Sequence, residues 1–251
     1  MVKLELAWAR SPSSVILKPN EIHIWRVFVD EWIAAIPDLQ NVLSPEEQAR
    51  AQRFYFERDR HSSIIARGVL RVLLGRYCTI DPAMILLHYN EFGKPNLTID
   101  GSPSPLYFNL AHSHTTIVYA FTYINHIGID IEYMRTNVEY EEVAQHYFSP
   151  REKEQLQAVP TEQKMQAFFA GWTRKEAYIK ARGKGLSIPL NSFDVTLQPD
   201  KDPCLLDCRE DPLAVNHWSL YALPPDPHYA GALALDGTCE HIHFWQLTSP
   251  F

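Results

Sequence analysis

The sequence predicts an α+β protein built from two similar subdomains, and three observations support this. The chain has 251 residues, 46 % of them hydrophobic, which is enough for a sizeable core in one large or two small domains. A serine–proline helix start occurs twice, at Ser44 and at Ser149. After each start, a long helical pattern is followed by several strand-like runs. We therefore expect a pseudo-dimer of subdomains 1–125 and 126–251, each with a small, mainly antiparallel sheet packed with helices, and a site at their interface.

The first half begins with an alternating stretch, 22–28, that predicts a strand followed by a short helix. Ser44 can cap the next helix, Pro45 suits its first position, and Glu47 completes a capping box. The helical pattern then continues, with a break, to about Leu74. Strand-like runs follow at 85–89, 107–110 and 116–122, with a turn at 91–95.

The second half repeats this order after a junction near Asn125. Ser149, Pro150 and Glu152 form another capping box. The helical region after it runs to Lys180 and stops at the glycines that follow. Strand-like runs are expected at 193–197, 218–223, 230–235 and 241–247.

Composition argues against several classes of protein. The formal net charge is −7, whereas a general nucleic-acid binder is normally basic. The four cysteines have no zinc-motif spacing, so reduced and mostly buried thiols are expected. The N-terminus lacks the apolar core of a signal peptide, and no apolar run approaches membrane-spanning length. We therefore expect a soluble, cytoplasmic protein.

The strongest functional signal is a pair of acidic segments that lie far apart in the sequence. The first, Gly128–Glu132, alternates as a strand does, so that Asp130 and Glu132 share one face and two isoleucines share the other. The second, Trp172–Lys180, predicts a helix on which Trp172, Glu176 and Lys180 lie along one stripe.

If that stripe faces the strand, three carboxylates meet beside one ammonium. Such a cluster is costly unless a hard cation binds it, and Mg²⁺ is the usual ion where a phosphate shares the site. For any one of these acids, a solvated strand face or an ordinary helical Glu–Lys pair is the simpler interpretation. The combination favours a site, because a surface helix would not need Trp172.

The two segments resemble the signature of the Sfp-type 4′-phosphopantetheinyl transferases. Further blocks resemble that family at family-like intervals, and the poorest matches are the first forty or so residues and the region from about 198 to 216. These blocks are Arg53-Phe54-Tyr55, Glu91-Phe92-Gly93-Lys94-Pro95, Phe108-Asn109-Leu110-Ala111-His112-Ser113, Tyr147-Phe148-Ser149 and Gly183-Lys184-Gly185-Leu186-Ser187.

The resemblance implies transfer of the phosphopantetheine arm of coenzyme A to a serine of an apo carrier protein, with adenosine 3′,5′-bisphosphate as the other product. It implies that Asp130, Glu132 and Glu176 ligate Mg²⁺, with Mn²⁺ as an alternative ion. Asp130 is then catalytic through the metal. Glu176 is the expected base for the serine proton, and Lys180 the expected contact to the diphosphate.

The resemblance also implies contacts to coenzyme A. His112 is expected at a phosphate, and Lys94 with Pro95 in the loop that lines the adenine pocket. The remaining expected contacts are Arg50, Arg53 and Ser63 for the 3′-phosphate and Lys175 as a second phosphate neighbour beside Lys180. His114 has no such support and is expected to be structural. Two departures weaken the match: Glu47 stands where some members place a lysine, and Ala111 where a serine is common.

Acyl, peptidyl or aryl carrier domains are the implied partners of a protein that is expected to be monomeric. Because such carriers are usually acidic, and this chain is too, net charge cannot steer the encounter. We expect an apolar patch at 133–148 with Met165, Phe168 and Phe169, although core packing is the simpler interpretation of those aromatics. Another Mg²⁺-dependent enzyme acting on a nucleotide diphosphate, and a non-catalytic carrier-binding module, are the alternatives.

Overall fold

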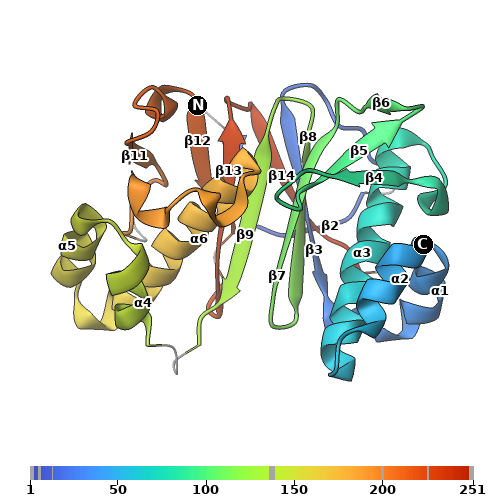
Figure 1. Cartoon of the computed structure of the whole chain (residues 1–251), viewed down its shortest axis with the longest axis horizontal. Helices are drawn as coiled ribbons and strands as arrows, with labels where there is room; N and C mark the ends of the chain where they lie inside the picture. The colour runs from blue at the N-terminus through green and yellow to red at the C-terminus, as the bar shows by residue number, and fades with distance from the viewer. Residues whose placement is uncertain are drawn as a thin grey trace.

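The computed structural model describes residues 3–4, 7–12, 14–135, 139–198, 201–224 and 226–248. In this part of the chain the strands form four sheets, of which two carry the architecture. Figure 1 shows these two sheets side by side in the middle of the molecule, with helices α1 to α3 on one flank and α4 to α6 on the other. The predicted α+β class and its two-subdomain arrangement are confirmed.

The N-terminal side is built on a six-stranded sheet with the order β1-β14-β3-β8-β7, and β2 pairs with β14. Its strands are β1 (Lys3–Leu4), β2 (Ala9–Arg10), β3 (Glu21–Phe28), β7 (Tyr107–Ser113), β8 (Thr116–Thr122) and β14 (His241–Gln246). The helices on its outer face are α1 (Ile36–Asn41), α2 (Pro45–Gln52) and α3 (Glu57–Cys78). A small sheet of β4 (Leu86–Tyr89), β5 (Pro95–Ile99) and β6 (Ser102–Pro103) follows α3.

The C-terminal side is built on a three-stranded antiparallel sheet with the order β12-β13-β9. Its strands are β9 (Ile127–Tyr133), β12 (Trp218–Ala222) and β13 (Tyr229–Asp236). The helix α6 (Lys164–Arg182) covers it, and α4 (Tyr140–Tyr147) and α5 (Pro150–Ala158) pack against α6. A two-stranded ribbon joins β10 (Phe193–Val195) to β11 (Leu205–Cys208). Short 3-10 turns occupy Val29–Ala35, Pro82–Met84, Thr161–Gln163, Gly185–Ser187, Leu190–Ser192 and Ala214–Asn216.

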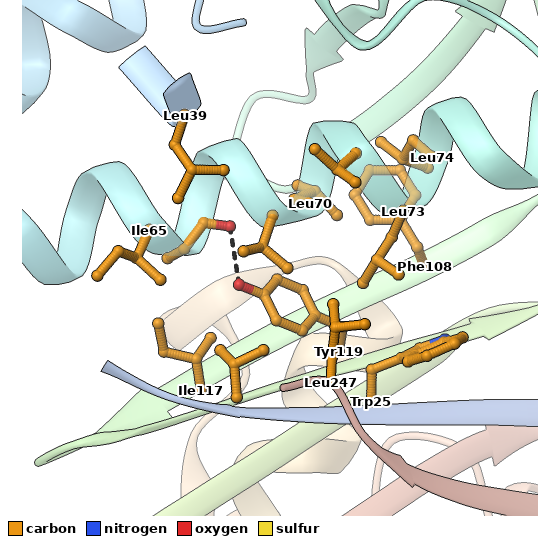
Figure 2. Packing of buried hydrophobic residues seen from close by; sticks show 14 of the residues in the cluster. Trp25, Leu39, Ile65, Leu70, Leu73, Leu74, Phe108, Ile117, Tyr119 and Leu247 are labelled. Atoms are coloured by element: carbon orange, nitrogen blue, oxygen red, sulfur yellow. Dashed lines mark hydrogen bonds between the residues drawn. The ribbon is translucent and has the colours of Figure 1, made fainter. Parts of the chain in front are cut away.

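The long helix α3 packs its apolar face on the outer face of the N-terminal sheet. Figure 2 shows Ile65, Leu70 and Leu73 of this helix above the sheet residues Trp25, Ile117 and Tyr119. All of these side chains are fully buried. The Tyr119 hydroxyl donates a hydrogen bond of 3.1 Å to the Ala66 carbonyl, so the one polar atom of this ring is satisfied inside the core.

A second core lies between the inner faces of the two sheets. Ile22 and Ile24 of β3 meet Ile129 and Ile131 of β9 in this cluster. The isoleucines of the acidic strand therefore face inward, as the alternating pattern predicted, and leave Asp130 and Glu132 on the opposite face, toward α6.

The last strand, β14, crosses back to the N-terminal sheet. It runs parallel to β3, with Ile242 opposite Ile22 and Phe244 opposite Ile24. Strand β8 is antiparallel to both of its neighbours, β3 and β7, so the prediction of mainly antiparallel sheets is correct, with the pairs of β14 as the exception. The sequence pattern predicted this strand but not its partner. The division at 125/126 stays a prediction.

The internal duplication extends to two buried ion pairs. In α2, Glu47 completes the capping box with Ser44, and its carboxylate also lies 2.6 Å from Nε of Arg71 on α3. In α5, Glu152 completes the second box, and its carboxylate lies 2.7 Å from Nζ of Lys175 on α6. In both halves one glutamate thus completes the N-terminal cap of a short helix and, through its ion pair, holds this helix against the long helix of its own subdomain.

Most predicted elements appear close to their expected bounds. The broken helical region is α2 and α3, and the strand patterns became β3, β4, β7 to β10 and β12 to β14. The helix α4 and the strands β1, β2, β5, β6 and β11 were missed. Three of the four thiols are at least partly buried, all four are free, and Cys204 is exposed. Among the described residues, no helix has the length and apolarity needed to cross a bilayer.

Candidate functional site

The acidic strand and the helix α6 approach each other unusually closely. A Cβ added at Gly128 of β9 would overlap with the backbone of Ala177 and Ala181 of α6. Only a glycine allows this approach, because every other residue carries that atom. The close packing brings the carboxylates of the strand next to the polar stripe of the helix, as the sequence predicted.

Asp130 and Lys180 are the centre of this contact. Nζ of Lys180 lies 2.6 Å from Oδ1 of Asp130. The other carboxylate oxygen, Oδ2, is buried without a hydrogen-bond partner. Burial raises the pKa of Asp130 to about 7, against the effect of the Lys180 ammonium, and the negative charges of Glu132 and Glu176 add to the rise. A buried carboxylate whose second oxygen has no hydrogen-bond partner can bind a cation through that oxygen.

The two other acids lie on either side. Glu176, one turn before Lys180, has its pKa raised by burial and by the neighbouring charge of Glu132, while Lys180 opposes this rise. The carboxylate of Glu132 accepts a hydrogen bond of 2.7 Å from Oγ of Ser113. The structure therefore brings together all three predicted metal ligands beside one ammonium.

Two side chains of β7 accept hydrogen bonds from the backbone of β9 and so link the two subdomains next to this cluster. Oδ1 of Asn109 accepts a hydrogen bond of 2.9 Å from the backbone N–H of Ile129. Oγ of Ser113 accepts one of 3.0 Å from the backbone N–H of Tyr133. Strands β7 and β9 have no backbone ladder between them in the described sheets, so these two side chains satisfy part of the β9 edge instead.

A pocket of about 430 Å³ opens beside the acidic cluster, between the subdomains. Its walls come from the 92–95 loop, from β7 and from the C-terminal half of α6, which contributes Glu176 and Lys180. The loop turns at Gly93, whose φ of +85° lies in the region that favours glycine. Lys94 and Pro95, which the resemblance places in a loop at the adenine, line this pocket.

Lys94, however, uses its ammonium within the protein. Nζ donates to the carbonyl oxygens of Ile127, Lys180 and Ala181 at 3.0, 2.8 and 3.0 Å. It thus caps the end of α6 and holds it to the start of β9. Burial lowers the pKa of Lys94 to about 8. Lys94 shapes the pocket by joining the subdomains, and its charge is already partnered there.

A second pocket of about 540 Å³, called the basic pocket below for its four arginines, adjoins the first, and the carboxylates of Asp30, Asp59 and Glu132 also line it. Arg50 and Ser63, the expected contacts to the 3′-phosphate, line this pocket together with Arg58. Arg67 lines both pockets, and its Nη1 is buried without a hydrogen-bond partner. Arg67 was not predicted as a contact from the sequence. Its spacing from Ser63 could have indicated it, because residues four apart lie on the same face of a helix.

His112 stands at the border of the two pockets and lines both. Its ring is open to the pockets, yet the surrounding protein still desolvates it enough to lower its pKa, and the Lys180 ammonium adds to this effect. A neutral imidazole next to Lys180 and Arg67 can donate one hydrogen bond to an anion. His114, expected to be structural, stacks on Tyr133 with 4.6 Å between ring centroids.

One predicted phosphate contact is wrong. Lys175 is completely buried, and its Nζ is bound by Glu152 at 2.7 Å and by the carbonyls of Leu190 and Phe193 at 2.8 and 2.6 Å. Its side chain points into the core of the C-terminal side, where its ion pair with Glu152 corresponds to the pair of Arg71 with Glu47 in the N-terminal side. Arg53 lies exposed at the end of α2 and lines neither pocket, so the structure gives no support to its predicted phosphate contact.

The two departures from the family pattern have structural explanations. Glu47 cannot be replaced by a cation here, because it caps α2 and neutralises the buried Arg71. Ala111 is 4 % exposed and packs its methyl group into the core between the sheets, while its neighbour His112 faces the pockets. The cation that Glu47 does not provide is available from Arg67.

The expected carrier patch is partly core. Phe168 and Phe169 are 3 % and 5 % exposed and pack inside the C-terminal cluster, so neither can contact a partner. Tyr147 is 48 % exposed, and its ring packs edge-on against Trp172. Residues 136–138 of the predicted stretch lie outside the described residues.

A strict criterion for a metal site requires one ligand atom from each of three residues to lie within 4.8 Å of the others. Across the described ranges, the group of three that passes it is Glu21, His23 and His243, on the N-terminal sheet. The acidic cluster at Asp130 is more open. That fits Mg²⁺, which usually binds to one or two carboxylates and completes its shell with water and substrate phosphates.

Comparison with known proteins identifies related chains. Residues 126–234 match the model described as 4′-phosphopantetheinyl transferase superfamily, and residues 23–123 match 4′-phosphopantetheinyl transferase, N-terminal. The chain is 38 % identical to 4′-phosphopantetheinyl transferase HetI of Nostoc sp., over 96 % of this chain and 99 % of that one. It is 35 % identical to 4′-phosphopantetheinyl transferase Sfp of Bacillus subtilis, over 63 % and 68 % of the two chains.

Proposed function

The chain belongs to the 4′-phosphopantetheinyl transferase superfamily and transfers the phosphopantetheine group to carrier proteins; we propose that it does so in the two joined pockets, with Mg²⁺ held by Asp130, Glu132 and Glu176. The observation that carries this proposal is the buried, unpartnered Oδ2 of Asp130 beside Lys180. Mg²⁺ bound there supplies positive charge for the diphosphate of coenzyme A. The open arrangement of the three carboxylates leaves room for water and phosphate oxygens.

The side chains around the cluster divide the chemistry among them. The serine hydroxyl of the carrier must lose its proton, and Glu176 is the carboxylate among the residues that line the first pocket. Its raised pKa brings this carboxylate closer to the pH at which a general base works well. Lys180 donates to the phosphate whose bond breaks, and its ammonium offsets the negative charge that develops on the leaving group.

Coenzyme A spans both pockets in this proposal. Its base lies against Phe92, Gly93 and Pro95 in the first pocket, and Lys94 keeps that wall in place. Its 3′-phosphate lies in the basic pocket, where Arg50 and Ser63 have the support of Arg67 and Arg58. His112, which lines both pockets, donates to a phosphate between them. Arg67 is the contact we consider strongest, because it is partly buried and its Nη1 has no hydrogen-bond partner.

We further propose that the acceptors are acyl, peptidyl or aryl carrier domains, that the protein works as a cytoplasmic monomer, and that Mn²⁺ can replace Mg²⁺. We also propose the division into nucleotide-side residues 1–125, which hold Arg50 and Ser63, and metal-side residues 126–251, which hold Asp130 and Glu176; β14 of the second range pairs with the sheet of the first. Within the predicted carrier patch we propose Tyr147 as a contact, since its ring is exposed; Trp172, which was not in the predicted patch, is half-buried and supports that ring edge-on.

Intact-protein mass spectrometry of an apo carrier domain tests the proposal. We expect a mass gain of one phosphopantetheine with the enzyme, coenzyme A and Mg²⁺, and none when EDTA is present. The variant Asp130→Asn should lose the product, whereas Asp207→Asn, which changes an exposed surface acid, should retain it.

The alternatives give different results. Coenzyme A binding without product on any carrier class, in an assay where a control transferase succeeds, would favour a carrier-binding module. Coenzyme A cleavage without carrier modification would favour a different enzyme acting on a nucleotide diphosphate. Full activity of Asp130→Asn would overturn the assigned metal site while leaving the reaction class intact.

A further inference from the structure

A polar cluster with no part in the proposed reaction lies on the N-terminal sheet. Glu21 and His23 come from the start of β3, and His243 comes from β14. In the parallel register His23 lies opposite His243, and Glu21 lies opposite His241. Because side chains alternate along a strand, all of these residues project from the same face of the two strands.

This cluster is distant from the transfer site. Val29, which directly follows β3, lines the basic pocket, whereas Glu21 and His23 stand at the other end of the same strand. Six residues of extended chain between His23 and Val29 correspond to roughly 20 Å. The cluster therefore belongs to neither of the two pockets.

The geometry is that of ligands around a small ion. Nε2 of His23 lies 3.7 Å from one oxygen of Glu21, and Nε2 of His243 lies 3.8 Å from the other. One ligand atom from each of the three residues falls within 4.8 Å of the others. These separations exceed a hydrogen bond, and two ligands of a tetrahedral zinc ion lie about 3.3 Å apart.

We infer that Glu21, His23 and His243 form a binding site for a transition-metal ion of the zinc type, which clamps β14 to β3. Two imidazoles and one carboxylate are a ligand set that zinc uses with an open fourth position. His243 is 34 % exposed in its side chain, so water can fill that position. Mg²⁺ does not suit this set, because it requires oxygen ligands.

The surroundings orient the ligands as a metal site requires. Nδ1 of His23 lies 2.9 Å from the hydroxyl of Tyr77, which also accepts a hydrogen bond of 2.8 Å from Nε1 of Trp25. When Nδ1–H donates to this hydroxyl, Nε2 presents its lone pair toward Glu21.

Lys18 supplies the counter-charge in the metal-free protein. Its Nζ lies 3.1 Å from Oε1 of Glu21, but its side chain is 71 % exposed. A surface ammonium of this kind leaves at little cost when an ion takes its place. Trp245 reports on the site, since its ring stacks on His243 at 5.4 Å and meets His23 edge-on at 4.5 Å.

The experiment uses the full-length, untagged protein after EDTA treatment and dialysis. Titration with Zn²⁺ against a chromogenic chelator should give one ion per chain, and bound Zn²⁺ should raise Tm. Glu21→Gln and His243→Ala should each weaken Zn²⁺ at least tenfold. His217→Ala, which changes an exposed histidine of the other subdomain, and Asp130→Asn should bind as the wild type does.

A second measurement needs no variant. Co²⁺ in place of Zn²⁺ should give the strong visible absorption of a four-coordinate site, and Cu²⁺ should quench the fluorescence of Trp245, while Mg²⁺ does neither. Failure to bind Zn²⁺ at micromolar concentration would overturn the inference, as would binding that survives His243→Ala or disappears in Asp130→Asn. None of these readouts depends on transferase activity, so the two proposals can fail separately.

Discussion

Lys180 and Asp130 are fifty positions apart in sequence and in direct contact, with 2.6 Å between Nζ and Oδ1. The ammonium satisfies one oxygen of a carboxylate that is 4 % exposed, and the other oxygen has no partner in the protein. The pair lies where β9 and α6, both of the C-terminal side, pack against each other. Substitution of Asp130 is therefore the most direct test of the proposed metal site.

Asp130→Asn should abolish Mg²⁺-dependent transfer while the protein stays folded. The amide keeps the size of the side chain but removes the charge that a cation needs, so kcat/KM should fall at least about a hundredfold. Rates measured over a range of Mg²⁺ concentrations check this. Wild-type kcat/KM in the variant would exclude Asp130 as a ligand.

Glu176→Gln should separate binding from chemistry. Loss of a positioned base lowers kcat by about 10²–10⁴, whereas coenzyme A affinity, measured calorimetrically without metal, should change little. The acidic limb of the pH–rate profile should also flatten, because the group with the raised pKa no longer titrates. An unchanged profile would point to water or another group as the base.

Stability of the metal-free protein should fall as the pH rises from about 4 to about 7. Asp130 has a folded pKa of about 7, above its ordinary value of about 3.9 in an unfolded chain. Between these values the unfolded state loses its proton first, so unfolding becomes easier as the pH rises. The contribution of this group is at most roughly 4 kcal/mol. Urea unfolding in EDTA should show this slope, and Asp130→Asn should reduce it; an equal slope in both proteins would contradict the raised pKa.

Lys175→Met should destabilise the protein without touching the nucleotide site. It leaves the fully buried Glu152 without its cation, a change that costs about 3–5 kcal/mol in comparable pairs. Denaturant unfolding measures this cost. Coenzyme A should bind the folded variant with wild-type affinity, and a selective loss of affinity would restore Lys175 as a phosphate contact.

Gly128→Ala should weaken both the fold and the site. The added methyl group overlaps with the backbone of Ala177 and Ala181, and overpacking of this kind costs about 1–3 kcal/mol. Because α6 must shift, Glu176 and Lys180 move away from Asp130, and kcat should fall more than the loss of folded protein explains. Gly237→Ala is the control for destabilisation without overpacking, since its φ of +121° strains an alanine while its nearest neighbour is only a side-chain methyl of Ile124 at 3.4 Å. Equal effects of the two changes on kcat would argue against close packing as the cause.

Local signals alone carried much of the fold. The two capping boxes at Ser44 and Ser149 gave the helix starts, because an N-cap depends on residues three apart. Alternation predicted β9 and placed Ile131 and Asp130 on opposite faces, because that follows from strand geometry. The spacing of Trp172, Glu176 and Lys180 likewise predicted one helical stripe, and the resemblance named the family.

Only the tertiary structure decided which cations serve the site and which serve the core. Lys175 and Lys180 are five positions apart on one helix, so they face different directions, and nothing local to them distinguishes a core partner from a phosphate contact. Glu152 forms a buried ion pair with Lys175, and carbonyls at the end of α6 accept hydrogen bonds from Lys94. Arg67, by contrast, has an Nη1 without a hydrogen-bond partner and lines the pocket. The pairing of β14 with β3 was equally hidden, because strand partners distant in sequence are chosen by the packing of whole sheets.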